Sequence, residues 1–202
     1  VFFDKMREQL ATFIGREAAL LEKRRSEFAS AQESVEAHTK LLTDTEHWVS
    51  HTHGVLAAAK AIIGHAVDME TGMRGFLVAG DQAFLEPYNA GGASFHKAVG
   101  ALKQTVSDNS KQVARLGRAE TLISDWADAW AKPAIQLRER VTRGGADITE
   151  LQSYILTKKG KANFDAFRGV MAAFAEEEEK LLITRGEAAR SAEEQIATDL
   201  EI

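Results

Sequence analysis

Apolar residues recur at every seventh position through the first 79 residues of the chain. One such column begins at Ile14 and ends at Leu77, and a charged residue, Glu70, occupies only one of its ten positions. The column beside it is also mostly apolar. A heptad stripe of this kind is typical of helices in coiled coils and helical bundles. The pattern predicts one nearly unbroken helix from about residue 3 to 79.

Three further segments show the same helical spacing of apolar residues, and short polar stretches separate them. The segments cover residues 88–106, 113–141 and 164–185. Pro133 lies inside the second of them, where its missing N–H removes one helical hydrogen bond, so we expect a kink there. Four antiparallel segments with short connections predict an all-α fold, an elongated up-down-up-down four-helix bundle with a long N-terminal helix.

The connections carry the residues that begin and end helices. Asp147 and Glu150 form a predicted capping pair for a short helix that begins at Ile148. The stretch KKGKAN at 158–163 either ends that short helix or bends it.

The first residues of the chain repeat the last predicted helix. Aligned without a gap, the 22 residues from Phe3 and the 22 from Phe164 are identical at nine positions, and the offset of 161 residues is 23 heptads. The helical phase is therefore the same in both copies. We interpret residues 1–34 as the last helix of a preceding bundle, continuous with the next helix. Residues 35–190 would then form the four-helix bundle itself, and residues 191–202 would form an exit helix toward a downstream module.

Composition excludes several classes of protein. The net charge of −5 argues against a nucleic-acid partner, which requires a basic face. With no cysteine, neither disulfide nor thiolate chemistry is available, and a cytoplasmic and a periplasmic location are both allowed. The chain begins inside an apolar pattern and ends inside a helical one, with no apolar run long enough for a membrane span, so we expect it to be part of a longer protein.

The stretch DMETGMRGFLVAGDQAFLEPY at 68–88 interrupts the regular pattern. Glu70 occupies an apolar-column position, and Arg74 lies four residues on, on the same face of the helix. Three roles are open for this pair: a structural ion pair at the helix reversal, a grip on a ligand, or catalysis. Because no nucleophile and base accompany it, catalysis is the least favoured role and no catalytic residue is expected. If Glu70 pairs with a buried arginine, its loss would strongly destabilise the bundle.

The glycines and Pro87 in this stretch predict a helix reversal. Gly72 and Gly75 allow another segment to approach closely, whereas Gly80 suits the left-handed end of the long helix. Asp81 can cap the following turn, and Pro87 fits the first turn of the next helix. No preceding strand or GxxxxGK pattern supports a phosphate loop.

Other polar and aromatic residues carry weaker signals. His47 and His51 are four residues apart, but no third ligand accompanies them, so we expect neither a metal nor another cofactor. Tyr88 and the two tryptophans at 126 and 130 are either core residues or part of a ligand cage. The acidic run at 176–179 predicts a solvated face with Glu178 turned inward.

A central motif and the closing helix together form a recognisable signature. The central residues are Trp48, His51, Thr52, Glu70, Thr71, Gly72, Arg74, Gly75, Gly80, Asp81, Phe84, Leu85, Pro87 and Tyr88. The closing helix contributes Glu178, Leu181, Leu182 and Arg185. In these residues, the region from 35 to 190 closely resembles the third type of CHASE domain.

The resemblance implies an extracytoplasmic sensory bundle of a bacterial histidine kinase, cyclase or chemoreceptor. It implies an unknown small-molecule or protein signal, a parallel homodimer, a periplasmic location, and attachment to the inner membrane through segments outside these 202 residues. Glu70, Arg74 and Tyr88 are the candidate ligand contacts. The module would be non-enzymatic and would transmit its signal by helix displacement. The alternative is a helical dimerisation or spacer module that only transmits.

Overall fold

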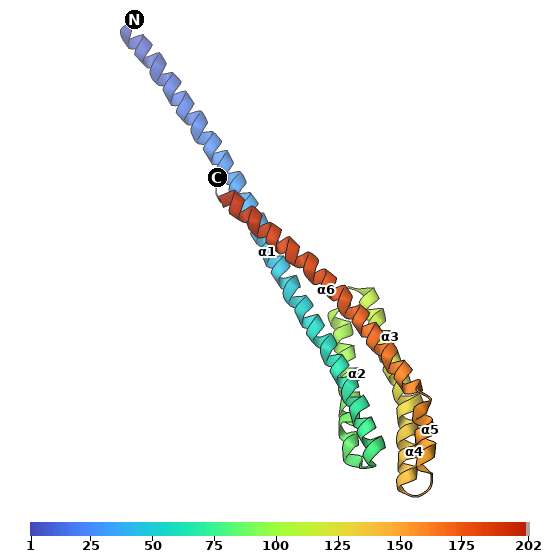
Figure 1. The fold of residues 1–202 in the computed structure, drawn as a ribbon. Helices are drawn as coiled ribbons and strands as arrows, with labels where there is room; N and C mark the ends of the chain where they lie inside the picture. Colours follow the sequence, from blue (N-terminus) through green and yellow to red (C-terminus); the bar gives the residue numbers. More distant parts are fainter. Residues whose placement is uncertain (201–202) are drawn as a thin grey trace. The chain divides into compact units, whose positions relative to one another are not determined.

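The computed structural model describes residues 1–200, and all of its regular structure is helical (Figure 1). The order is α1 (Phe2–Ala79), η1 (Gln82–Leu85), α2 (Glu86–Thr105), α3 (Ser110–Trp126), η2 (Ala127–Ala131), α4 (Lys132–Thr142), α5 (Ile148–Leu156) and α6 (Lys159–Leu200). Here η1 is a 3₁₀ helix and η2 a π-helical segment. The chain divides into two compact units. One contains residues 1–50 together with the end of the chain from residue 183, and the other contains residues 51–182.

The unit of residues 51–182 is a four-helix bundle. The end of α1 and the rod formed by α3, η2 and α4 run in one direction, and α2 and the start of α6 run in the other (Figure 1). Each rod buries one apolar face, as helical spacing requires. The most deeply buried large side chains are Ile62, Met73, Phe76, Phe95, Leu102, Leu116, Ile123, Trp126, Leu151, Phe164, Phe167 and Phe174. The predicted all-α four-helix bundle is confirmed.

The reversal after α1 is built from the glycines and polar residues that the sequence indicated. Gly80 adopts a φ of +74°, and its N–H donates to the Phe76 carbonyl at 2.7 Å. Asp81 Oδ1 then accepts from the Ala83 N–H at 3.0 Å, which caps η1. Pro87 lies in the first turn of α2. The predicted helix reversal is therefore confirmed in detail.

Two glycines of α1 allow this reversal to fold back closely. A Cβ atom at Gly72 would lie 2.8 Å from the Phe84 carbonyl oxygen and 2.8 Å from the Tyr88 nitrogen. At Gly75 a Cβ atom would lie 2.6 Å from the Phe84 ring. At Gly72 the neighbours are backbone atoms, which leave no room for a side chain, so the predicted close approach is confirmed.

Near Pro133, where the sequence predicts a kink, the structure has a π-helical turn. Pro133 has no N–H to donate to the carbonyl of Ala129, four residues earlier. The π segment Ala127–Ala131 comes just before it, and the Tyr154 hydroxyl donates to the carbonyls of Ala129 (3.3 Å) and Trp130 (3.2 Å). Burial raises the pKa of this hydroxyl above its usual value. One hydroxyl of α5 thus shares its proton between two carbonyls at the π-helical turn.

The start and end of α5 follow the sequence signals. Asp147 accepts from the Thr149 N–H at 2.8 Å, and Glu150 accepts from the Asp147 N–H at 3.1 Å, which forms the predicted capping box. The hydrogen bonds from Thr149 hold the pKa of Asp147 below its usual value. After α5, Lys158 adopts a φ of +57° and α6 begins at the next residue. The stretch at 158–163 therefore ends the short helix rather than bending it.

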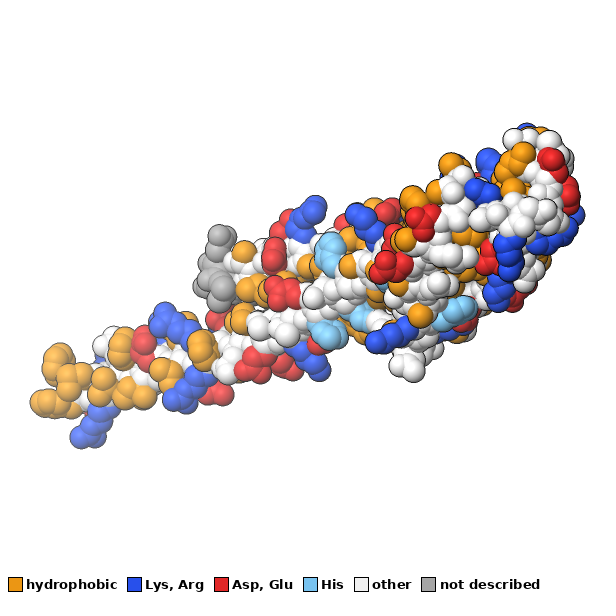
Figure 2. Space-filling view, turned by 90° about the horizontal axis from the view of Figure 1, so that it is seen from below, with side chains coloured by type: hydrophobic (Ala, Val, Ile, Leu, Met, Phe, Trp, Pro, Cys, Tyr) orange, Lys and Arg blue, Asp and Glu red, His pale blue; other side chains and the backbone are white. Residues whose placement is uncertain are grey.

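Helix α1 runs without a break from Phe2 to Ala79, which confirms the helix predicted from the heptad stripe. Its first 30 residues are exposed, including a series of large apolar side chains. Figure 2 shows hydrophobic side chains gathered on this N-terminal part of the helix. The exposed members are Phe2, Phe3, Met6, Leu10, Phe13, Ile14, Leu20, Leu21 and Phe28.

Replacing Gly72 with alanine should destabilise the bundle, because the new methyl group meets backbone atoms that cannot rotate away. We expect a loss of roughly 1–3 kcal/mol in the free energy of unfolding. Gly64→Ala is the matched control on the same helix, since a Cβ there has nothing within 4 Å. That control should gain up to about 1 kcal/mol from helix propensity. Urea unfolding of both variants measures the difference, and equal stabilities would contradict the close packing.

Candidate functional site

Glu70 of α1 lies at the edge of the bundle core and pairs with two arginines. Its side chain is 20% exposed. Arg168 Nη2 of α6 donates to Glu70 Oε2 at 2.9 Å, and Arg74 Nη1 lies 3.6 Å from Glu70 Oε1. The expected partner, Arg74, is therefore present but is the more distant of the two. The shorter contact joins α1 to α6, and sequence spacing did not reveal it.

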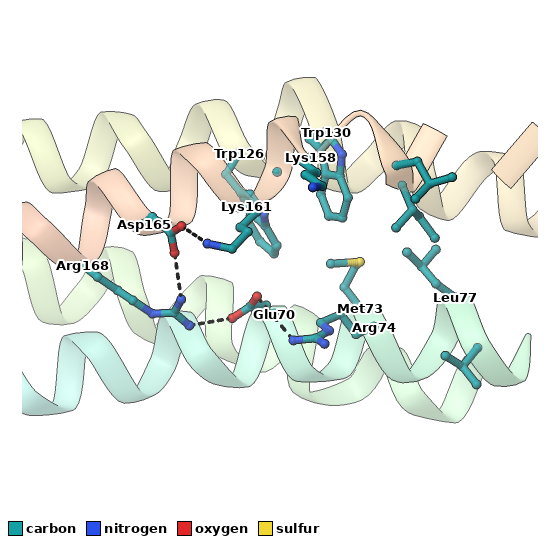
Figure 3. Close-up of a pocket in the computed structure, with 14 residues that line it drawn as sticks. Glu70, Met73, Arg74, Leu77, Trp126, Trp130, Lys158, Lys161, Asp165 and Arg168 are labelled. Carbon is teal, nitrogen blue, oxygen red and sulfur yellow. Dashed lines mark hydrogen bonds and ion pairs between the residues drawn. The ribbon is translucent and has the colours of Figure 1, made fainter. Parts of the chain in front are cut away.

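The ion pairs continue along α6 (Figure 3). Arg168 Nη1 donates to Asp165 Oδ1 at 3.3 Å, and Lys161 Nζ donates to Asp165 Oδ2. The hydrogen bond from Lys161 is the main reason why the pKa of Asp165 lies below its usual value. The guanidinium of Arg168 also lies 4.6 Å from the centre of the Phe164 ring. Arg168 is thus held by two carboxylates and an aromatic face.

These charged groups border a pocket of about 580 Å³ within the four-helix bundle. Helices α1 and α6, the tryptophans at the end of α3 and in η2, and the end of α5 supply its walls (Figure 3). The lining residues are Glu70, Met73, Arg74, Leu77, Val78, Trp126, Trp130, Ile155, Leu156, Lys158, Gly160, Lys161, Asp165 and Arg168. The pocket therefore combines an apolar wall with a charged rim.

Aromatic rings form one wall of the pocket. The rings of Trp126 and Trp130 stack with centroids 6.2 Å apart, and Trp130 stacks on Tyr154 at 6.1 Å. The indole nitrogen Nε1 of Trp130 is buried and has no hydrogen-bond partner among residues 1–200. A Cβ atom at Gly160 would lie 2.3 Å from the Trp130 ring, so only glycine allows α6 to begin here. The π turn thus places Trp130 directly against the first turn of α6.

Tyr88, the third candidate ligand contact, lies outside this pocket. It is half-buried beside the core, and its ring centroid lies 6.3 Å from that of Trp126. Burial is the main cause that raises the pKa of its hydroxyl. The structure therefore brings Glu70 and Arg74 together at the pocket, while Tyr88 packs against the core.

The other motif residues lie outside the pocket lining. Thr52 is fully buried and His51 is half-buried, whereas Thr71 is exposed. In the unit that contains residues 1–50, the Arg185 guanidinium lies 4.8 Å from the Trp48 ring centre. Arg185 Nη1 also donates to the Trp48 carbonyl at 3.4 Å. Trp48 and Arg185, 137 residues apart, thus join α1 to α6 through a cation–π contact.

Glu178 points inward, as the sequence indicated, and it is part of a buried polar network. The amide of Gln112, itself fully buried, donates to Glu178 Oε1 at 2.7 Å and to the Phe174 carbonyl at 3.1 Å. Arg115 Nη1 donates to the amide oxygen of Gln112 at 2.9 Å. The other glutamates of the acidic run are at least partly exposed. Gln112 carries no signal of burial in the sequence, because a glutamine at a helical position is usually exposed.

In the described part of the chain, no group of three or more His, Cys, Asp or Glu side chains is arranged to hold a metal ion. No helix within residues 1–200 combines the length and the apolar character that crossing a membrane requires.

The family model of the CHASE3 domain matches residues 45–188. The chain belongs to the CHASE3 domain family. Among solved structures, it is similar to the sensor domain of the histidine kinase HK9 from Rhodopseudomonas palustris, with a TM-score of 0.56 and 21% sequence identity. That match covers 65% of this chain and 98% of the other, and it supports the fold. No curated protein matches the chain.

CHASE3 domains are extracytoplasmic sensory domains of signalling receptors, and membership of this family identifies the chain as such a module. The Trp48, Glu70 and Arg185 positions that carried the resemblance all lie within the matched region. The match begins ten residues after the predicted start of the bundle at residue 35. It leaves the assignment of residues 1–34 to a preceding bundle as a prediction.

Replacing Glu70 with alanine should cost the bundle only about 1 kcal/mol. The strong destabilisation considered above required a buried arginine, and here Arg168 and Arg74 are 48% and 71% exposed. Both guanidinium groups therefore stay hydrated when the carboxylate is lost. Thermal unfolding of Glu70→Ala and Glu70→Gln measures the effect, and a loss of 3 kcal/mol or more would show that the pair is effectively buried.

Proposed function

We propose that this chain is the sensory module of a bacterial transmembrane receptor, a histidine kinase or a chemoreceptor, and that displacement of α6 relative to α1 carries its signal. The observation that carries the proposal is the Glu70–Arg168 ion pair beside the pocket. It joins the helix by which the chain enters the bundle to the helix by which the chain leaves it. A ligand in this pocket contacts both helices at once.

The strength of this contact suits a switch. An ion pair as exposed as Glu70–Arg168 contributes on the order of 1 kcal/mol or less. A ligand shifts an equilibrium between two states by the difference in its affinity for them. A ligand that binds one separation of α1 and α6 modestly better than the other is therefore enough to change the populations of these two states. The Gln112–Glu178 network, in contrast, is buried and suits a part of the bundle that stays packed.

The similar sensor domain from Rhodopseudomonas palustris is described as part of a histidine kinase. This supports a histidine kinase as the output of the present receptor, with a chemoreceptor as the second candidate. The receptor would lie in the inner membrane through segments outside these residues, with this module in the periplasm. We further propose that the receptor is a parallel homodimer, as the family resemblance implies.

We also propose that residues 1–34 complete a preceding bundle. In α6 the apolar residues of the repeat are at most 1% exposed: Phe164, Phe167, Met171 and Phe174. The residues at the same repeat positions in α1 are between 50% and 67% exposed: Phe3, Met6, Leu10 and Phe13. The face that α6 packs into its bundle is thus uncovered in the first part of α1. Because α1 continues unbroken, it would join the two bundles directly.

The alternative function is a spacer that senses nothing and only transmits. A spacer needs only an evenly packed core, whereas this bundle contains a pocket of about 580 Å³ with convergent charged side chains. Such a pocket is typical of ligand-binding sites. This observation favours the sensory role.

Insertions in α1 test whether the helix transmits by its phase. Seven residues added after Ala31 turn the flanking segments by only about 20° relative to each other, from 100° per residue, whereas two residues turn them by roughly 200°. In the full-length receptor, signalling should survive the insertion of seven residues. Signalling should be lost, or locked in one state, after the insertion of two residues. Both insertions are made from the same helix-forming residue types. Kinase activity or chemotactic response gives the readout.

Circular dichroism of the same variants provides the control, because both should remain as helical as the parent chain. Equal signalling by the two variants would show that this part of α1 is only a tether. Loss of signalling in both would show that the length of α1, rather than its phase, is what matters, and would contradict transmission by phase.

A further inference from the structure

The pocket described above has an excess of positive charge. Its lining contains four cationic side chains, Arg74, Lys158, Lys161 and Arg168, and two carboxylates, Glu70 and Asp165. The carboxylates pair with Arg74, Arg168 and Lys161. The protein as a whole is acidic, with a net charge of −5. A local surplus of cations in an acidic protein indicates a site for an anion.

Lys158 provides a cation with no competing partner. Within residues 1–200 its ammonium group has neither a hydrogen bond nor an ion pair, and the side chain is exposed at the pocket. Its backbone has a φ of +57°, a conformation that is uncommon for residues other than glycine. The turn between α5 and α6 holds Lys158 in this conformation at the rim.

The start of α6 adds to the same positive potential. Gly160 and Lys161 lie in the first turn of this long helix, and both line the pocket. The first N–H groups of a helix have no partner within the helix and carry partial positive charge. The helix end and the lysines therefore favour negative charge at the same place.

The opposite wall favours a flat apolar group. Trp126 and Trp130 line the pocket together with Met73 and Leu77 (Figure 3). Ile155 and Leu156 also line it and are exposed. Aromatic side chains prefer to stack on or meet the edge of another ring, which adds specificity beyond simple burial. The pocket thus places a ring-binding wall beside an anion-binding rim.

We propose that this pocket binds a small aromatic carboxylate. The ring lies against the indoles of Trp126 and Trp130, and the carboxylate accepts hydrogen bonds from Lys158 and Lys161. This rests on the proposed sensory function and names the class of its signal molecule. The carboxylate also competes with Asp165 and Glu70 for Lys161 and Arg168. Binding therefore loosens the ion pair that ties α6 to α1.

Isothermal titration calorimetry of the 202-residue chain tests the ligand class with a set of matched probes. Indole-3-acetate is expected to bind, whereas tryptamine, which has the same ring system with a cationic side chain, is expected to bind at least tenfold more weakly. Acetate lacks the ring, and hexanoate replaces it with a flexible chain; both should also bind at least tenfold more weakly. Raising the salt concentration to about 0.5 M should weaken the binding of indole-3-acetate, because the pocket rim is open to solvent.

Two neighbouring lysines supply a matched pair of variants. Lys158→Gln should weaken the binding of indole-3-acetate by about fivefold, since it removes the unpaired cation at the rim. Lys159→Gln removes the same charge one residue away, outside the pocket lining, and should leave the affinity within about twofold. Both side chains are exposed, so both variants should unfold at the temperature of the parent chain.

The outcomes separate the ligand class from the sensory function. Equal binding of tryptamine, equal binding of hexanoate, equal losses in the two lysine variants, or no binding of indole-3-acetate would each overturn the proposed ligand class. The insertion experiment in the full-length receptor would still test signalling by α1. If indole-3-acetate binds as expected but never changes the output of the full-length receptor, the ligand chemistry stands and the sensory role of the pocket fails.

Discussion

The close packing of α1 against the chain that follows it is the constraint on which the bundle depends. At Gly72 the backbone of α1 meets backbone atoms of Phe84 and Tyr88, and a Cβ atom would clash. At Gly91 of α2 a Cβ atom would lie 2.7 Å from the His65 carbonyl. Glycines on both helices thus bring α1 and α2 into backbone contact. This contact fixes which face of α1 remains for α6, and so places Glu70 and Arg74 at the pocket.

The aromatic wall of the pocket, which contains Trp130, lies where Pro133 lacks the N–H of a helical hydrogen bond. Pro133 cannot donate to the Ala129 carbonyl, and Tyr154 of α5 donates to it instead. The same hydroxyl reaches the Trp130 carbonyl, and the two rings stack. The π turn is therefore tied to α5, and Trp130 is held against the start of α6. π-helical turns are frequent at functional sites, and here the turn carries part of the proposed ligand-binding wall.

The polar contacts of the bundle divide into two kinds with different physical consequences. Gln112 and Glu178 are buried and satisfy each other, so separating them would leave polar groups unpaired in the core. Glu70 and Arg168 are partly hydrated, so separating them costs little. Both contacts involve α6, at different points along the helix. The bundle thus contains one contact suited to permanent packing and another suited to a change of state.

Local features of this protein could be predicted from sequence, because short-range geometry determines them. The heptad column from Ile14 to Leu77 predicted the continuous α1, and Asp147 with Glu150 predicted the start of α5. Gly80 marked the end of α1 because few other residues adopt a positive φ. Each of these signals lies within a few residues of the structure that it determines.

Contacts between distant segments were decided only by the tertiary structure. Arg168 lies 98 residues from Glu70, and heptad spacing shows only that Glu70 is near the core, not which cation on another helix reaches it. Tyr88 is a candidate ligand contact from the sequence together with Glu70 and Arg74, but it packs on Trp126 outside the pocket. Sequence spacing does not show this either, because it does not show which helices meet. Periodicity determines which face of each helix is buried. The rotation and separation of the packed helices decide which side chains meet, and these depend on how all the buried side chains fit together.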